Sequence, residues 1–210
     1  MSEAYFVTLV RHGESTANAE GRHQGQMDFP LTERGQAQAQ ALARRWLREG
    51  RRYHALIASP LSRALQTAQI LADTLNLDIE TDPLWMERDN GVLAGWRWEE
   101  ARERFPIPDL LHLYHPVGDT GESIWDLYLR AGQAIQRLLR RPPGRYLVVS
   151  HGGLLHMVLY AILGIAPQPN FLGPRFVLRN TAFVDLEYRP EEGRWRLHGL
   201  TNPNEEGFLG

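Results

Sequence analysis

The sequence predicts an α/β fold, a three-layer sandwich with a mainly parallel central sheet and helices on both faces. Short apolar runs of strand length alternate along the chain with longer stretches whose apolar residues recur at helical spacing. Such alternation favours parallel strands, because each crossover helix returns the chain to the same end of the sheet. The 210 residues contain no repeat and no linker. We therefore expect a single domain, residues 1–210, with residues 82–120 as an insertion over one edge of the sheet.

The first half of the chain predicts three strands separated by two helices. Each strand candidate is short, contains β-branched or aromatic residues, and is bounded by a turn. Thr32 is a suitable N-cap for the first helix, and Pro60 suits the start of the second. We expect strands at residues 5–10, 54–58 and 77–81, one helix from Thr32 to near Gly50, and another that follows Ser59 and Pro60.

The second half begins with the irregular insertion and then returns to regular structure. Residues 82–120 hold four prolines and one short charged helix near residues 98–104. Ser123 is a candidate N-cap for a long helix, which the sequence PPG at residues 142–144 stops. We expect that helix to reach about residue 141, followed by a strand at residues 146–150, a helix at about residues 154–163, and a final pair of strands at residues 182–188 and 195–200.

The composition excludes several kinds of chemistry. All 23 basic residues are arginines, so the chain has neither a Schiff-base lysine nor a P-loop lysine. It contains no cysteine, which excludes thiol nucleophiles, disulfides and thiolate metal sites. The formal net charge of -2 gives no general attraction to nucleic acids or anionic membranes. Any phosphorylated ligand must therefore be bound by local charges.

The N-terminal segment lacks the features of a secretory signal. The first ten residues contain no basic region, and their apolar stretch stops at Arg11. No run approaches the roughly 18 apolar residues of a membrane span. We expect a cytoplasmic protein, a monomer or a homodimer, that binds neither nucleic acid nor membrane.

Two of the predicted strands end in similar turns. Residues 9–13 read LVRHG and residues 149–153 read VSHGG, so each strand delivers a histidine followed by a glycine. In open α/β sheets, ligands bind where the carboxyl ends of the strands meet. Arg11 beside His12 indicates an anionic ligand, for which phosphate is the obvious candidate. We therefore expect His12 and His151 to share one site.

Phosphoryl transfer without a metal needs a nucleophile, cations around the phosphoryl oxygens and an acid for the leaving oxygen. A neutral imidazole offers a lone pair at pH 7, so His12 is the candidate nucleophile. Arginine suits the second task, because its planar fork grips two oxygens and stays charged. Arg63 begins a helix just after a strand and projects toward the same edge. The amides of Gly152 and its neighbours begin another helix, and helix N-termini favour anions.

These stretches, taken in order, closely resemble the histidine phosphatase superfamily, also called the phosphoglycerate-mutase-like family. The resemblance rests on LVRHGES with Asn18, then LTERG, SPLSRALQTA, GES and VSHGG, which begin at residues 9, 31, 59, 121 and 149. The stretches cover most of the chain in the family's order, so a chance match of all of them is negligible.

The resemblance implies that His12 becomes phosphorylated and that Arg11, Arg63 and His151 bind the phosphoryl group. Glu87 matches the position of the family's acid, which would protonate the leaving oxygen and then activate water against the phosphohistidine. A carboxyl group in a dry pocket near a phosphate has a raised pKa, which suits it to donate a proton.

Other positions carry weaker implications. Asn18, Gln24 and Gly25 match residues that touch phosphate or substrate in relatives, and the amide of Gly152 is a candidate ligand. Asp89 is an alternative proton donor, because some members place the acid two residues later.

The loop after Glu87 departs from the family's phosphatase pattern. Many phosphatases of the family carry a glutamate before the glycine that is Gly95 here, whereas this chain has Ala94. Residues 87–95 look more like the mutase version. However, residues 96–120 lack the adjacent arginine pair and the lysine with which mutases hold the substrate carboxylate, and the chain is shorter than typical mutases. The missing arginine pair and lysine and the shorter chain favour hydrolysis, since a mutase must retain its intermediate and exclude water.

We therefore predict a metal-independent phosphomonoester hydrolase that acts through a phosphohistidine on a small phosphorylated metabolite, with no metal ion and no cofactor. Residues 82–120 would cover the substrate over the active-site edge and determine its identity. Two alternatives stay open. One is a phosphoglycerate mutase, which moves the phosphoryl group between hydroxyls of phosphoglycerate. The other, with less support, is a non-catalytic protein that binds a phosphorylated ligand.

Overall fold

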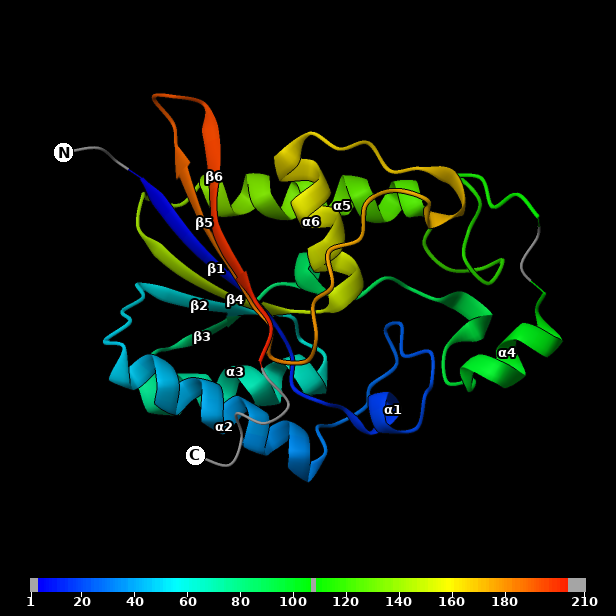
Figure 1. The fold of residues 1–210 in the computed structure, drawn as a ribbon, viewed down its shortest axis with the longest axis horizontal. Coiled ribbons are helices and arrows are strands. Elements are labelled where there is room, and N and C mark those ends of the chain that lie inside the picture. Colours follow the sequence, from blue (N-terminus) through cyan, green and yellow to red (C-terminus); the bar gives the residue numbers. More distant parts are fainter. Residues whose placement is uncertain (1–3, 107–108, 204–210) are drawn as a thin grey trace.

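A six-stranded sheet runs through the centre of the computed structural model, which describes residues 4–106 and 109–203 (Figure 1). The strand order is β3-β2-β4-β1-β5-β6. The strands from β3 to β1 pair in parallel, whereas β5 and β6 join beside β1 as antiparallel strands. The predicted mainly parallel sheet is therefore confirmed, with an antiparallel pair at one edge. The strands are β1 (Tyr5–Arg11), β2 (Ala55–Ala58), β3 (Ile79–Thr81), β4 (Arg145–Ser150), β5 (Phe183–Arg189) and β6 (Arg194–Thr201).

Helices cover both faces of this sheet, as predicted. Successive residues of β1 point to opposite faces, so that Leu9 belongs to one apolar cluster and Val10 to the other. No helix in the described ranges is long and apolar enough to cross a membrane. The helices on the Val10 face are α2 (Glu33–Arg48) and α3 (Ser62–Leu75), and those on the Leu9 face are α5 (Ile124–Leu139) and α6 (Gly152–Leu163).

Most element boundaries follow the local signals in the sequence, but β3 begins two residues later than predicted. Asn76 ends α3 in the left-handed conformation (φ 56°), and the amide of Leu77 still donates to the carbonyl of Ala72 over 3.1 Å. Only Ile79–Thr81 is free to pair with β2. The short elements are α1 (Thr16–Ala19), α4 (Trp98–Arg104), η1 (Pro83–Trp85), η2 (Gly91–Leu93) and η3 (Pro169–Phe171).

The insertion, residues 82–120, is joined to the loop that follows β1. The amide of His23 donates to the carbonyl of Trp96 over 2.9 Å, and the amide of Gly95 donates to the carbonyl of His23 over 2.7 Å. Figure 1 shows α4 set apart from the sheet, on the side toward which β1 runs. The insertion therefore lies beyond the carboxyl ends of the strands, while its place within a single domain stays a prediction.

The N-terminus of α2 gives a test of the fold. The Thr32 hydroxyl accepts a hydrogen bond from the amide of Gly35 over 3.0 Å. Thr32→Ala removes this cap and should lower the free energy of unfolding by about 1 kcal/mol. Thr32→Ser keeps the hydroxyl and should stay close to wild type. Urea unfolding followed by circular dichroism measures both, and equal stabilities for the two variants would contradict the capping role.

Candidate active site

The carboxyl ends of β1 and β4 bring the two predicted histidines together. The strands pair in parallel up to Arg11 and Ser150, and the amide of His12 continues the ladder by donating to the carbonyl of Ser150 over 3.0 Å. The next residue of each strand is then a histidine, and the two imidazole centroids lie 5.1 Å apart. The structure therefore places His12 and His151 side by side at this edge.

The His12 ring is held in one tautomer. Its Nδ1 lies 2.6 Å from the carbonyl oxygen of Gly13. Because a carbonyl only accepts hydrogen bonds, Nδ1 carries the proton of the neutral ring. The Nε2 atom then keeps its lone pair, and it has no hydrogen-bonding partner among the residues that the structure describes. His12 thus presents the atom that a phosphohistidine mechanism needs.

Burial and nearby charges keep His12 neutral. Its side chain is 2% exposed, and desolvation is the main reason that its pKa lies well below 6.5, with smaller contributions from Arg11 and Arg63. The pKa of His151 also lies well below 6.5, mainly because of burial and then because of Arg63. Both rings are therefore neutral at pH 7 in the unliganded protein.

Main-chain carbonyls orient the two predicted arginine ligands. The Nη1 and Nη2 atoms of Arg63 donate to the carbonyls of Met27 and Gly25 over 3.0 and 2.8 Å. The Nη1 atom of Arg11 donates to the carbonyl of Leu178 over 2.6 Å. Burial lowers the pKa of both guanidinium groups, to about 10 for Arg63. No carboxylate forms an ion pair with either arginine among the described residues.

Three buried nitrogens around these residues lack partners. Among the described side chains, only four fully buried polar atoms make no hydrogen bond, and three of them are Arg11 Nε, Arg63 Nε and His151 Nδ1. The fourth belongs to Trp46, in the core on the α2 face. Buried donors are normally satisfied, and leaving one unpaired costs about 1–3 kcal/mol. The cluster is therefore suited to an anion that accepts several hydrogen bonds.

The predicted acid, Glu87, is fixed by the first turn of α6. Its Oε2 accepts from the amide of Gly153 over 3.0 Å, and its Oε1 accepts from the amides of Leu154 and Arg88 over 3.0 and 2.9 Å. The backbone of Glu87 is held by Arg130, whose Nη2 donates to the Glu87 carbonyl over 3.1 Å. A side chain at Gly153 would displace the Glu87 carboxylate, because a Cβ there would lie 2.5 Å from Glu87 Oε1.

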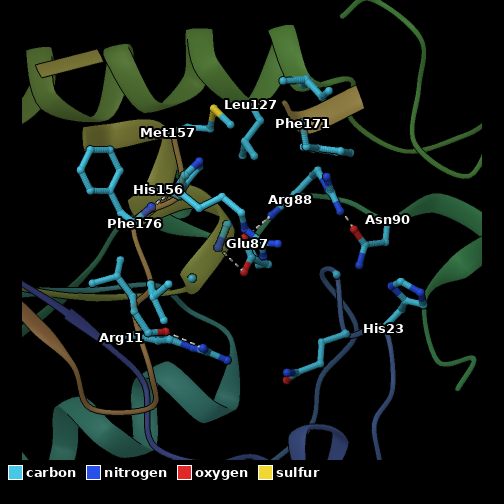
Figure 2. Close-up of a pocket in the computed structure, with 18 of the residues that line it drawn as sticks. Arg11, His23, Glu87, Arg88, Asn90, Leu127, His156, Met157, Phe171 and Phe176 are labelled. Atoms are coloured by element: carbon cyan, nitrogen blue, oxygen red, sulfur yellow. Dashed lines mark hydrogen bonds between the residues drawn. The ribbon is translucent and has the colours of Figure 1, made fainter. Parts of the chain in front are cut away.

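A cavity of about 630 Å³ opens beside Glu87 (Figure 2). Arg11 and Glu87 line it, whereas His12, Arg63 and His151 are buried and do not. His12, the candidate nucleophile, is thus buried close to Arg11, which itself belongs to the cavity wall. The weaker sequence candidates that line the same cavity are Asn18, Gln24, Gly25 and Gly152.

These weaker candidates are tied to one another. The Oδ1 atom of Asn18 accepts from the main-chain amide of Ser15 in the cap of α1, over 3.2 Å. The side-chain NH2 group of Asn18 has no partner among the described residues. Gln24 Oε1 lies 2.7 Å from the hydroxyl of Ser15. Gly25 contributes its carbonyl to Arg63, as described above. All three therefore belong to the segment between β1 and α2 that lines the cavity.

The alternative acid, Asp89, is differently placed. It does not line the cavity, and its Oδ1 accepts from the amide of Gly91 over 2.9 Å in a local turn. Its main-chain amide donates to Glu122 over 3.0 Å. Glu87 therefore lines the cavity, whereas Asp89 is bound within its own loop.

Three further residues support the site, and the sequence analysis does not assign them. The Ser59 hydroxyl lies 2.7 Å from His151 Nε2. The Thr67 hydroxyl accepts from the amide of Gly13 over 3.0 Å. Asn180 Nδ2 donates to the carbonyl of His12 over 3.1 Å. Ser59 and Thr67 lie within a matched motif, but Asn180 is in a segment without regular periodicity, so no local signal indicates it.

The described residues contain no group of three histidine, aspartate or glutamate side chains that could hold a metal ion. Arg11 and Arg63 are the arginines whose positive charges act on both His12 and His151.

Comparisons with known proteins find relatives that match most of the chain. The family model for the histidine phosphatase superfamily (branch 1) matches residues 7–202. A protein of Enterobacter sp. (strain 638) named probable phosphoglycerate mutase GpmB is 38% identical over 208 residues, which cover 92% of this chain and 88% of that protein. A corresponding protein of Cronobacter sakazakii is 35% identical over the same shares of the two chains.

Solved structures give the same picture. Bacillus stearothermophilus YhfR superposes with a TM-score of 0.82 at 29% identity, covering 97% of this chain and 99% of that one. A mycobacterial glucosyl-3-phosphoglycerate phosphatase, solved with VO3, has a TM-score of 0.77 at 26% identity and covers 95% and 100%. A phosphoserine phosphatase from Entamoeba histolytica, solved with phosphoserine, has a TM-score of 0.76 at 25% identity and covers 98% and 99%.

The contact between Gly153 and Glu87 gives a test of the acid. Gly153→Ala should displace the Glu87 carboxylate and lower kcat by about 10²- to 10⁴-fold, the usual range for losing a general acid. The loss should be larger for an alkyl phosphate than for para-nitrophenyl phosphate, whose leaving group needs less protonation. Gly132→Ala is the matched control, because a Cβ there meets no atom within 4 Å. Equal losses with both substrates would contradict the role of Glu87.

The buried histidines predict a pH-dependent stability. Because the folded protein holds the pKa of His12 and His151 well below 6.5, the unfolded chain takes up protons that the folded protein does not. The free energy of unfolding should therefore fall with decreasing pH below about 6.5, by up to about 1.4 kcal/mol per pH unit for each histidine. Urea unfolding between about pH 7 and about pH 5.5 should show a shallower loss for the His12→Asn, His151→Asn double variant. Parallel curves for the two proteins would contradict this prediction.

Proposed function

Since the chain belongs to the histidine phosphatase superfamily (branch 1), we propose that it is a metal-independent phosphomonoester hydrolase that acts through a phosphohistidine on a small phosphorylated metabolite. One observation carries the proposal: two unpaired buried donors, Arg11 Nε and Arg63 Nε, and the unpaired buried nitrogen His151 Nδ1 accompany a histidine whose Nε2 has no partner among the described residues. A phosphoryl group supplies the acceptors that these donors lack. We also expect a cytoplasmic protein that is a monomer or a homodimer.

In the first step, Arg11, Arg63 and His151 hold the phosphoryl oxygens, and the amide of Gly152 adds a further donor. The His12 Nε2 lone pair attacks phosphorus and forms a P–N bond, while the P–O bond to the leaving group breaks. Glu87 gives its proton to the leaving oxygen. The Gly13 carbonyl, which accepts from His12 Nδ1, stabilises the positive charge that develops on the ring.

In the second step, water attacks the phosphohistidine. The Glu87 carboxylate takes one proton from the water, its oxygen bonds to phosphorus, and the P–N bond breaks to return neutral His12. Glu87 thus regains the proton that it donated, and inorganic phosphate leaves. Asn180 and the Ser150 carbonyl, which hold the His12 backbone, keep Nε2 in place through both steps.

Phosphoglycerate mutase is the second candidate, because the relatives named above carry that name at 35 and 38% identity. Two observations favour hydrolysis. A cavity of about 630 Å³ is in the range that accommodates a drug-sized ligand, so a three-carbon substrate leaves room for water. Residues 96–120 also lack the arginine pair and the lysine of mutases.

An assay of product formation separates the two enzymes. We expect wild type to release inorganic phosphate from simple phosphomonoesters, and to release phosphate from 3-phosphoglycerate with bisphosphoglycerate primer rather than isomerise it. His12→Asn should lower phosphate release by about 10³-fold or more, as expected for loss of a nucleophile. It should also abolish the acid-labile phosphoprotein seen by ³¹P NMR. His198→Asn is the control, because His198 lies on the edge strand β6, two strands away from β1 in the sheet.

Three outcomes would overturn parts of the proposal. Efficient isomerisation with little phosphate release would identify a mutase. Unchanged activity of His12→Asn would reject the phosphohistidine. Loss of wild-type turnover in a chelator would reject the metal-independent mechanism.

A further inference from the structure

Three neighbouring strands end in buried polar side chains at one edge of the sheet. In the sheet order β2-β4-β1, the residues that follow the strands are Ser59, His151 and His12. The amide of Ser59 donates to the carbonyl of Val149 over 3.0 Å and so continues the pairing of β2 with β4. None of the three residues is more than 2% exposed. The proposed reaction uses both histidines but assigns no role to Ser59.

The Ser59 hydroxyl has a single acceptor for its proton. Its oxygen accepts from the amide of Leu61 over 3.3 Å and lies 2.7 Å from His151 Nε2. Among the residues that the structure describes, the hydroxyl makes no other hydrogen bond. Because an amide N–H only donates, the hydroxyl proton can be accepted only by His151 Nε2. Nε2 then carries a lone pair, and the proton of the neutral ring lies on Nδ1.

The opposite tautomer of His151 would leave two buried groups unsatisfied. The ring is neutral, because burial and the charge of Arg63 hold its pKa well below 6.5, so its proton can lie on either nitrogen. With the proton on Nε2, the Ser59 hydroxyl would have no acceptor and Nδ1 would hold an unpaired lone pair. With the proton on Nδ1, only Nδ1 lacks a partner among these groups. Since buried polar groups are normally paired, Ser59 favours the Nδ1–H tautomer.

The two histidines then carry the same tautomer for opposite purposes. His12 Nδ1 donates to the Gly13 carbonyl, so that ring offers a lone pair at Nε2. His151 Nε2 accepts from Ser59, so that ring offers a proton at Nδ1. A nucleophile needs the lone pair, whereas a ligand for an anion needs the proton. With the opposite tautomer, Nδ1 of His151 would meet phosphoryl oxygens with a lone pair, which repels them.

We propose that Ser59 is a positioning residue that fixes His151 in the Nδ1–H tautomer, so that His151 binds the phosphoryl group as a neutral hydrogen-bond donor. The inference rests on the proposed function, because it takes the phosphoryl group to lie at His12 and His151. A donor that is fixed in advance needs no change of tautomer when negative charge develops on the phosphoryl oxygens. Ser59 acts through the ring and does not itself touch the substrate.

The ring nitrogens of His151 report the tautomer directly. Long-range ¹H–¹⁵N spectra of the unliganded protein with ¹⁵N-labelled histidine, recorded near neutral pH, separate a nitrogen that bears a proton from one that bears a lone pair. The signals of His151 are those that His151→Asn removes. Wild type should show the proton on Nδ1. Ser59→Ala removes the hydroxyl and should move both ring signals toward the opposite tautomer, whereas Ser59→Thr keeps the hydroxyl and should keep the wild-type pattern.

Binding of inorganic phosphate and turnover show what the tautomer contributes. Titration calorimetry should show that Ser59→Ala binds phosphate about 10-fold more weakly than wild type, the effect of weakening a hydrogen bond to a charged group. Its kcat/KM should fall by about 10- to 100-fold, because a donor to the phosphoryl oxygens matters most in the transition state. The loss should be the same for para-nitrophenyl phosphate and for an alkyl phosphate, since Glu87 still protonates the leaving group.

Ser62→Ala is the matched control. Ser62 lies three positions after Ser59, at the start of α3, but its hydroxyl donates to Asp28 Oδ2 over 2.5 Å and not to a histidine. The variant should keep the tautomer of His151 and the phosphate affinity of wild type. Thermal unfolding of each variant shows whether it folds, and the wild-type spectrum tests the inference without any variant.

Four results would overturn the role of Ser59. They are a wild-type proton on Nε2 of His151, an unchanged tautomer in Ser59→Ala, an unchanged phosphate affinity in that variant once its tautomer has moved, and an equal loss of affinity in Ser62→Ala. The proposed function can fail separately. Absence of hydrolysis with every phosphomonoester would overturn it, while the change of tautomer and the weaker phosphate binding in Ser59→Ala would still support this inference.

Discussion

The parallel pairing of β1 with β4 is the constraint on which the site depends. Its register sets Arg11 opposite Ser150, so the next residue of each strand is a histidine at the same edge. A shift of one residue would turn one ring toward a face of the sheet, because side chains alternate along a strand. Helix packing on both faces fixes this register, since Leu9 and Val10 are fully buried on opposite sides. The packing of the core therefore determines where the two histidines lie.

The electrostatics of the site follow from how its cations are held. Arg11 and Arg63 are oriented by the carbonyls of residues far away in the chain and not by carboxylates. A carbonyl directs a guanidinium without neutralising it, so the positive charge stays available to a ligand. The same charge, together with burial, keeps the neighbouring His12 neutral. The same arrangement thus leaves Arg11 and Arg63 available to a ligand and keeps His12, the candidate nucleophile, neutral.

The sequence predicts the layers, the strand ends and the central residues of the site, because these depend on local patterns. Hydrophobic periodicity indicates the strands, and the turns that follow them contain His12 and His151. The sequence pattern does not indicate Asn180, whose side chain donates a hydrogen bond to the carbonyl of His12, 168 positions away in the chain. The pattern also does not indicate that the left-handed Asn76 makes β3 begin later. Nor does it indicate that Arg130 on α5 donates a hydrogen bond to the carbonyl of Glu87. Such contacts arise only when distant segments meet.

The backbone support of Arg63 has a consequence for how this site can diversify. Because Met27 and Gly25 contribute carbonyl oxygens, no exchange of their side chains removes those hydrogen bonds, provided that the loop keeps its path. The groups that face the rest of the cavity, in contrast, are largely side chains, from the loop after β1, the insertion, α5, α6 and the segment around Phe171. Point substitutions can thus alter the cavity while the hydrogen bonds that orient Arg63 stay the same. The path of the backbone therefore orients Arg63, whereas side chains that can be exchanged line most of the remaining cavity.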